Sequence, residues 1–282
     1  MAELDHVVWH RQERLREPIV IAAFEGWNDA GDAATTAARH LRDAWDLELV
    51  AELDPEEFYS FTDTRPQVAF DEGGLRHIEW PATRFWAGTI PERERDVVVL
   101  EGIEPNLRWR TFGEHIAGVA GELGATLVVT LGALLTDIPH TRPTSVIGTA
   151  DSADLITRLD LRPSSYEGPT GIVGALHQSC RTAGLDSISL WASVPSYVPG
   201  STSPKAALAL LGRVGQLLDS TIPVTELEIA TTDYERQLDE LVQEDEESST
   251  YVAELERVFD EQALHGDGSA LVDEVERFLR DR

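Results

Sequence analysis

The feature that most constrains the fold is the alternation of short, β-branched apolar runs with stretches of helical periodicity. The run from Pro18 to Phe24 is apolar throughout and stops at a glutamate and a glycine, which is typical of a buried strand that ends at a breaker. Similar runs lie at 97–100, 126–131, 145–148 and 187–194. Because helical stretches separate these runs, the pattern predicts an α/β fold with a mainly parallel, twisted sheet that is flanked by helices.

The segment between the first and the later runs has a different pattern. We expect a helix over 33–45 with Asp32 as its cap, then a strand over 47–53. Residues 68–70, 75–80 and 84–86 alternate around the sequence Asp71-Glu-Gly-Gly74. This part predicts an antiparallel meander.

From residue 221 onward the chain becomes helical and acidic. Residues 221–282 contain 19 acidic residues and 5 arginines, which together carry half of the net charge of −28. We therefore predict two domains, an α/β core over 1–220 and an acidic helical module over 221–282. Within the module we expect an exposed hinge at 244–250 and a further helix at 271–278.

Composition excludes several classes of function. Fifty-one acidic residues against 23 basic ones would repel nucleic acid and anionic lipid, so we predict neither as a partner. A lone Cys180 allows no intramolecular disulfide, and the chain begins without a leader or a membrane-length apolar stretch; we expect a cytoplasmic protein. The eight histidines are scattered without ligand spacing, so no metal is predicted.

One group of candidate site residues follows the first strand, in the segment 24–31. Open α/β sheets bind ligands at the carboxyl ends of their strands, which makes Glu25, Trp27, Asn28 and Asp29 candidates for a binding or interface site. The spacing matches neither a dinucleotide-binding motif nor a P-loop, so no cofactor is predicted. In the alternative interpretation, these side chains only bond and pack the loop.

A second group lies between Thr136 and Pro143. Asp137, His140 and Arg142 combine a carboxylate, an acid–base group and an anion clamp. Equally, Asp137 fixes the other two in a rigid turn, or Arg142 pairs across a subunit interface.

A third group follows the run at 97–100. It contains Glu104, Arg108 and Trp109, which form either a pocket wall or an ion pair with neighbouring packing.

Four segments together resemble the proteasome assembly chaperone family, of the type named for its second member. They are 24–31, the stretch from Glu57-Phe-Tyr59 to Arg65-Pro66, Glu104-Pro105 with Arg108-Trp109, and Pro139-His-Thr-Arg-Pro143. The resemblance covers roughly residues 15–215. It implies an α/β sandwich similar to the purine nucleoside phosphorylase fold, a bacterial-type homologue that assembles as a homotrimer, and relatives elsewhere that help to assemble the proteasome α-ring.

The resemblance supplies no catalytic residue. Chaperones and activators that dock on proteasomes often end in a hydrophobic residue, a tyrosine and any residue, whereas this sequence ends Arg280-Asp281-Arg282. We therefore expect any contact with a proteasome to use another face.

Two functional hypotheses follow. In the first, the protein is a non-enzymatic assembly chaperone or interaction protein, a homo-oligomer whose motif loops contact one another, proteasome subunits or another client. In the second, it is an enzyme acting on a small polar substrate, such as a nucleoside or glycoside, by analogy of fold. The second requires Asp29, His140 and Arg142 to converge on one open pocket.

Overall fold

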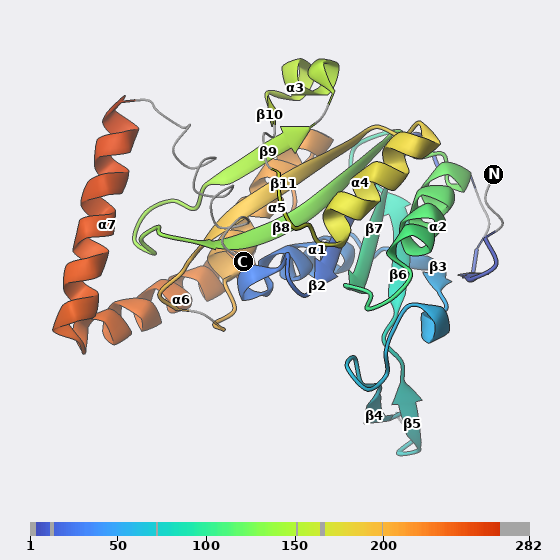
Figure 1. Ribbon diagram of the computed structural model, residues 1–282, viewed down its shortest axis with the longest axis horizontal. Helices are drawn as coiled ribbons and strands as arrows, with labels where there is room; N and C mark the ends of the chain where they lie inside the picture. Colours follow the sequence, from blue (N-terminus) through green and yellow to red (C-terminus); the bar gives the residue numbers. More distant parts are fainter. Residues whose placement is uncertain are drawn as a thin grey trace.

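A computed structural model describes residues 4–11, 14–71, 73–150, 152–163, 167–198 and 200–265. The strands of its main sheet are β1 (Val7–Trp9), β2 (Ile19–Glu25), β3 (Glu48–Leu53), β6 (Thr83–Thr89), β7 (Asp96–Ile103), β8 (Leu127–Thr136), β9 (Val146–Ala150), β10 (Arg162–Pro163) and β11 (Ser187–Pro195). Within the described residues these nine strands form one sheet in the order β1-β3-β6-β7-β2-β8-β11-β9-β10 (Figure 1).

Parallel pairing occupies the centre of this sheet. Strands β7, β2, β8 and β11 are mutually parallel. Antiparallel strands extend the sheet on both sides, because β6 pairs with β7, β3 with β6, β1 with β3 and β9 with β11. The predicted α/β fold with a large sheet flanked by helices is confirmed, and its parallel character belongs to the buried centre.

Helices cover both faces of the sheet. Helices α1 (Ala33–Ala44) and α5 (Pro204–Leu218) pack on one face, and α2 (Trp109–Glu122) and α4 (Ile172–Ala183) pack on the other. Strand β2 serves both layers: Ile19 and Ile21 belong to the first core cluster, whereas Val20 and Phe24 belong to the second. The alternation of side chains along a strand therefore links the two cores.

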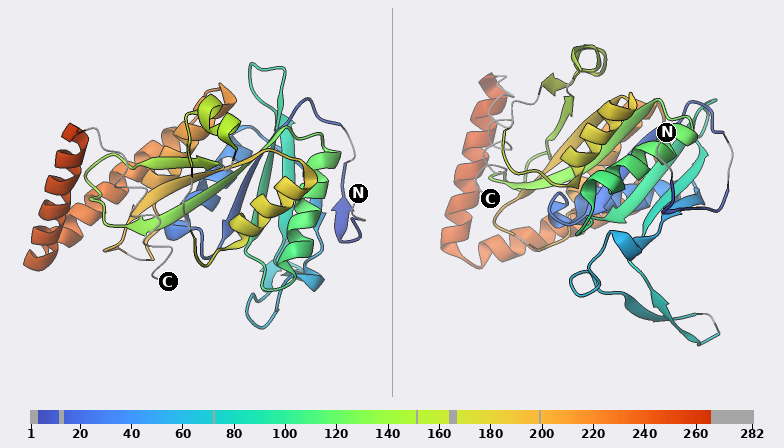
Figure 2. Two further views of the ribbon diagram at one scale, coloured as in Figure 1. Left: turned by 45° about the horizontal axis from the view of Figure 1, so that its top comes forward. Right: turned by 45° about the vertical axis from the view of Figure 1, so that its right-hand side comes forward.

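The expected antiparallel meander is correct in two strands and wrong in the third. Strands β4 (Gln67–Phe70) and β5 (Arg76–Glu79) form a separate hairpin, which projects from the body of the molecule (Figures 1 and 2). The third segment is β6, which leaves the hairpin and joins the main sheet between β3 and β7. Large apolar side chains of the hairpin region are exposed at Val68, Phe70, Leu75, Ile78 and Trp80.

Two short strands and one short α-helix escaped the sequence analysis. These are β1, β10 and the seven-residue helix α3 (Ala153–Leu159). Each is too short to show a clear period, and only pairing with a longer neighbour defines β1 and β10.

As far as the structure describes it, the acidic segment forms two helices, α6 (Thr225–Gln243) and α7 (Glu246–His265), which we call the arm. The expected hinge is largely wrong: only the residues between α6 and α7 leave the helix, because Asp245 accepts the backbone N–H of Ser248 at 2.8 Å and so begins α7. The proposed domain boundary between residues 220 and 221 stays a prediction. Leu227 of α6 belongs to the same core cluster as α1 and α5, so the beginning of the arm packs on the core. The expected helix at 271–278 lies outside the described residues.

None of the helices in the described ranges combines the length and the apolar character needed to cross a bilayer.

Two phenylalanines test this description of the core. Phe24 is 1% exposed between the sheet and α2, whereas Phe70 on the hairpin is 70% exposed. We expect Phe24→Ala to lower the free energy of unfolding by about 3–5 kcal/mol, because it leaves a cavity, and Phe70→Ala to change it by less than about 0.5 kcal/mol. Urea denaturation of the two variants measures both values, and equal losses would contradict the assigned burial.

Candidate functional site

Asp29 anchors the loop between β2 and α1. Its Oδ1 accepts the backbone N–H groups of Ala34 at 2.7 Å and of Thr35 at 3.3 Å, and its Oδ2 accepts the Thr35 hydroxyl at 2.5 Å. The carboxylate therefore caps the free N–H groups at the start of α1. The expectation that Asp32 is this cap is wrong: its backbone is left-handed, with φ at 49°, and its side chain makes no capping bond.

Glu104 holds three segments together at the carboxyl ends of the strands. Its Oε1 accepts the backbone N–H of Ile172, at the start of α4, at 2.7 Å and the amide of Asn28 at 3.4 Å. Gly171 lies so close to Asn28 that a Cβ at this glycine would approach the amide nitrogen to 2.2 Å. Glu104 and Asn28 thus belong to the frame that fixes the loops.

The carboxyl ends of β2 and β7 open on a charged cavity of about 450 Å³. Glu25 lines it, and so do four arginines and two further glutamates: Arg39, Arg42, Arg65, Arg84, Glu79 and Glu101. Glu25 pairs with Arg39 across its wall. Burial raises the pKa of Glu101, whose Oε2 accepts from Arg42 at 2.9 Å. Asp29 lies behind Thr35, which also lines the cavity.

His140 is buried in the loop between β8 and β9. Its Nε2 lies 3.1 Å from Oδ1 of Asp239 on α6, and its Nδ1 lies 2.7 Å from the hydroxyl of Tyr197. The same hydroxyl accepts the backbone N–H of His140 at 2.8 Å. Burial raises the pKa of Tyr197 to about 12, so its hydroxyl stays protonated and able to donate.

Arg142 and Asp137, in the same loop, contact α7. The guanidinium of Arg142 binds both carboxylate oxygens of Asp260, at 2.8 and 2.7 Å, and lies 3.2 Å from Oε1 of Glu256. These carboxylates raise the pKa of Arg142 further above its usual range. Oδ1 of Asp137 accepts the hydroxyl of Tyr251 at 3.1 Å.

The third group has local partners. Arg108, whose φ is 53°, forms an ion pair with Glu57. Trp109 donates its indole N–H to the carbonyl of Pro105 at 2.5 Å. Trp27, a candidate residue of the first group, is half-buried.

The three residues of the enzymatic hypothesis have separate partners. Asp29 caps α1, His140 binds Tyr197 and Asp239, and Arg142 binds Asp260 and Glu256. None of the hydrogen bonds or ion pairs found in the described part of the chain joins any two of the three, and none of the three lines the charged cavity. The contacts therefore give each of the three residues its own partners, and their convergence on one open pocket stays a prediction.

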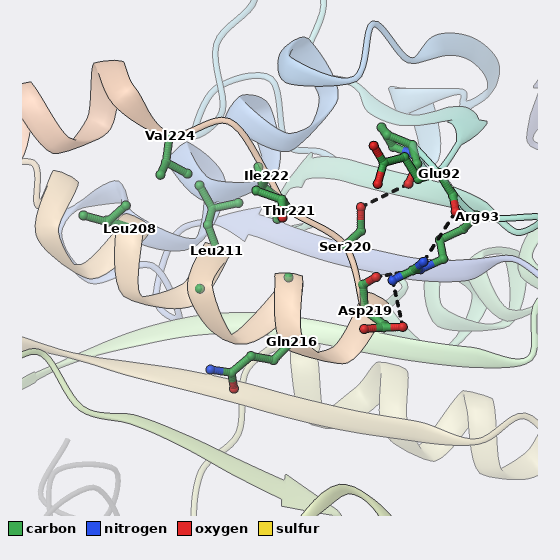
Figure 3. A pocket seen from close by; sticks show the side chains of 13 residues that line it. Glu92, Arg93, Leu208, Leu211, Gln216, Asp219, Ser220, Thr221, Ile222 and Val224 are labelled. Atoms are coloured by element: carbon green, nitrogen blue, oxygen red, sulfur yellow. Dashed lines mark hydrogen bonds and ion pairs between the residues drawn. The ribbon is translucent and has the colours of Figure 1, made fainter.

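A second cavity, of about 470 Å³, lies at the root of the arm (Figure 3). Arg93 closes one side, where its guanidinium donates to the carbonyl of Asp219 at 2.6 Å and pairs with the carboxylate of the same residue at 2.8 Å. Leu208, Leu211 and Ile222 supply apolar walls. No residue of the three candidate groups lines it.

Several residues where the arm contacts the core were missed, two on the core and four on the arm. They are Tyr197, Lys205, Glu235, Asp239, Glu256 and Asp260. A signal existed for the acidic ones, since both helices carry carboxylates four residues apart, on one helical face. The partners of Asp239 and Asp260 on the core were not predictable, because they lie 99 and 118 residues away along the chain.

Comparisons with known proteins give one consistent result. The sequence model of the PAC2 family matches residues 23–242. A PAC2 family protein from Streptomyces avermitilis is 48% identical, with a TM-score of 0.78, and the match covers 83% of this chain and 99% of that one. A proteasome-assembly chaperone homologue from Mycobacterium tuberculosis is 44% identical, with a TM-score of 0.75 and the same coverage.

A further Mycobacterium tuberculosis protein, of unknown function, is 28% identical with a TM-score of 0.85, and that match covers 100% of this chain and 97% of the other. Among curated proteins no match was found.

The buried capping carboxylate of Asp29 makes the stability of the fold depend on pH. Burial raises its pKa from 3.8 to about 6, although its three donors act in the opposite direction. Between about pH 4 and pH 6 the folded chain keeps a proton that the unfolded chain releases, so this residue makes the free energy of unfolding fall as the pH rises.

Asp29→Asn should remove about 3 kcal/mol of that fall, because the amide keeps an acceptor for α1 but does not titrate. Urea denaturation across this pH range, compared with Asp32→Asn as the control, measures the difference. A slope unchanged in Asp29→Asn would contradict the raised pKa.

Proposed function

The chain belongs to the PAC2 family, and on this premise we propose that it is a non-enzymatic assembly chaperone or interaction protein that binds proteasome subunits or another protein client. One observation carries the proposal: a chaperone homologue that is 44% identical to this chain is matched over 99% of its length. The surroundings of the candidate residues agree with it, since their polar groups bond helix ends and the arm.

Assembly as a homotrimer, in the cytoplasm, is part of this proposal. Among the predicted interface residues, Arg108 is exposed, and Leu107 beside it is 49% exposed. Their position after β7 leaves them available to a second copy or to a client. Arginine beside apolar surface is a composition that interfaces favour.

We expect purified proteasome α subunits to bind the intact protein at low salt. The net charge of −28 steers a client with a basic contact surface, so the association rate should fall at least tenfold between about 50 and 500 mM NaCl. Surface-based binding kinetics measure the rate, and the mass in solution at both salt concentrations serves as the control for disassembly. An intact oligomer that binds no α subunit at either salt concentration would overturn the proteasome-directed role.

The alternative function, an enzyme acting on a small polar substrate, retains one favourable observation. The charged cavity lies at the carboxyl ends of β2 and β7, where α/β sheets bind ligands. It would bind through Arg39 and Arg65 rather than through His140 and Arg142. Calorimetric titration with nucleosides and glycosides tests it: binding that is lost in Arg65→Ala would favour this alternative, and the absence of heat would remove it.

A further inference from the structure

An eight-residue pattern occurs once in each helix of the arm. Residues 233–240 read Asp-Tyr-Glu-Arg-Gln-Leu-Asp-Glu, and residues 254–261 read Glu-Leu-Glu-Arg-Val-Phe-Asp-Glu. Both consist of an acid, an apolar residue, Glu, Arg, any residue, an apolar residue, Asp and Glu. We call this pattern the acidic motif. Residues 274–279, Glu-Val-Glu-Arg-Phe-Leu, repeat its first six positions and lie outside the described residues.

Corresponding positions of the two copies have the same role. The central arginine faces outward in both and pairs within its own helix: Arg236 with Asp233 and Glu240, and Arg257 with Glu254 and Glu261. The glutamate and the aspartate at the third and seventh positions are four residues apart, so they share one face of the helix. In both copies this face is turned toward the core.

The first copy binds the start of α5 and the loop between β8 and β9. Glu235 accepts from Nζ of Lys205 at 2.5 Å, and Asp239 lies 3.1 Å from Nε2 of His140. Nζ of Lys205 also donates to the carbonyl of His140 at 2.5 Å, which joins the two groups. Tyr234 and Leu238, the apolar residues before each acid, are buried.

The second copy binds the next part of the same loop. Glu256 accepts from the Thr141 hydroxyl and lies 3.2 Å from Nη1 of Arg142, while Asp260 binds Arg142 through both oxygens. Leu255, the apolar residue before Glu256, is buried as well. Two neighbouring parts of one surface therefore accept the same motif from two different helices, which indicates recognition of the motif itself.

This surface is unusual in so acidic a chain. It gathers two permanent cations, Lys205 and Arg142, beside a histidine, and every one of them is paired with a carboxylate of the arm. The two aspartates of the motif remain accessible to solvent: the side chain of Asp239 is 52% exposed and that of Asp260 is 54% exposed. Ion pairs with so much exposure are individually weak, so a competing carboxylate can replace them.

We propose that the surface formed by His140, Thr141, Arg142 and Lys205, the acidic-helix receptor, binds an acidic amphipathic helix of a partner protein, and that the arm occupies it within the same chain. The partner helix that fits carries two carboxylates four residues apart, each preceded by an apolar residue. Charge complementarity on both parts of the surface supports this occupant. The proposal does not rest on the assembly role, because the receptor is defined by contacts inside this chain.

The part of the receptor that holds the second copy, Thr141 and Arg142, can be emptied without changing the receptor residues. In the full-length variant Glu256→Arg/Asp260→Arg, the second copy of the motif repels Arg142, and the receptor residues are intact. The probe is a fluorescent peptide with the natural sequence of residues 246–262. We expect this variant to bind the peptide at least tenfold more tightly than the natural protein, whose own arm competes, as measured by fluorescence anisotropy.

The charge-reversed system gives a matched control. In full-length Arg142→Glu, the natural peptide should not bind, and a peptide that carries the two arginine substitutions should bind instead. Arg142→Met removes the cation without adding a charge and should bind neither peptide tightly. Arg76→Glu, on the distant hairpin, should leave the peptide preference unchanged.

The readouts separate a receptor from a general charge effect. The proposal would be overturned if both peptides bound all variants with equal affinity. It would also be overturned if Glu256→Arg/Asp260→Arg bound no natural peptide although its thermal unfolding matched that of the natural protein. Hydrogen exchange adds a direct check: α7 amides should lose protection in Arg142→Glu and regain it when Asp260→Arg is added.

Discussion

Double-sided burial of the central strands is the constraint on which the rest of the structure depends. Strand β2 places alternate apolar side chains into two cores, one under α1 and α5 and one under α2 and α4. Both helical layers must therefore be present, and the connections between strands must cross the faces of the sheet. The loops that result converge at the carboxyl ends of the strands, which is why the candidate residues lie there.

Acidic side chains at this edge of the sheet cap the ends of helices. At the same edge, other α/β sheets bind a ligand. Asp29 and Glu104 supply the carboxylates that meet the exposed N–H groups of α1 and α4. A helix N-terminus attracts an anion, and here the chain provides that anion itself. This explains why acidic residues follow the strands although the chain already carries a large negative charge.

The sequence predicted the buried parts of this fold better than its surface contacts. The apolar runs located β2, β7, β8 and β11, because burial on both faces demands continuous hydrophobicity. The capping residue of α1 was misplaced by three positions, because the short 3₁₀ turn before the helix brings the carboxylate of Asp29 within hydrogen-bonding distance of the first N–H groups of α1. The contacts of His140 and Arg142 were not predictable, because they depend on how the arm folds over a loop that is distant in sequence. The acidic motif can be found in the sequence, but only the contacts show that its third and seventh positions bind the core.

Lys205 is the single lysine of the sequence, and α6 covers it. Its side chain is 13% exposed and its ammonium group is bonded to Glu235 and to the carbonyl of His140. An acylating reagent, or an enzyme that attaches a tag through an isopeptide bond, needs a free amine that has lost its proton and its partners. The folded chain therefore offers no unshielded side-chain amine to such chemistry, and amine reactivity at this one position reports directly on whether the arm is in place.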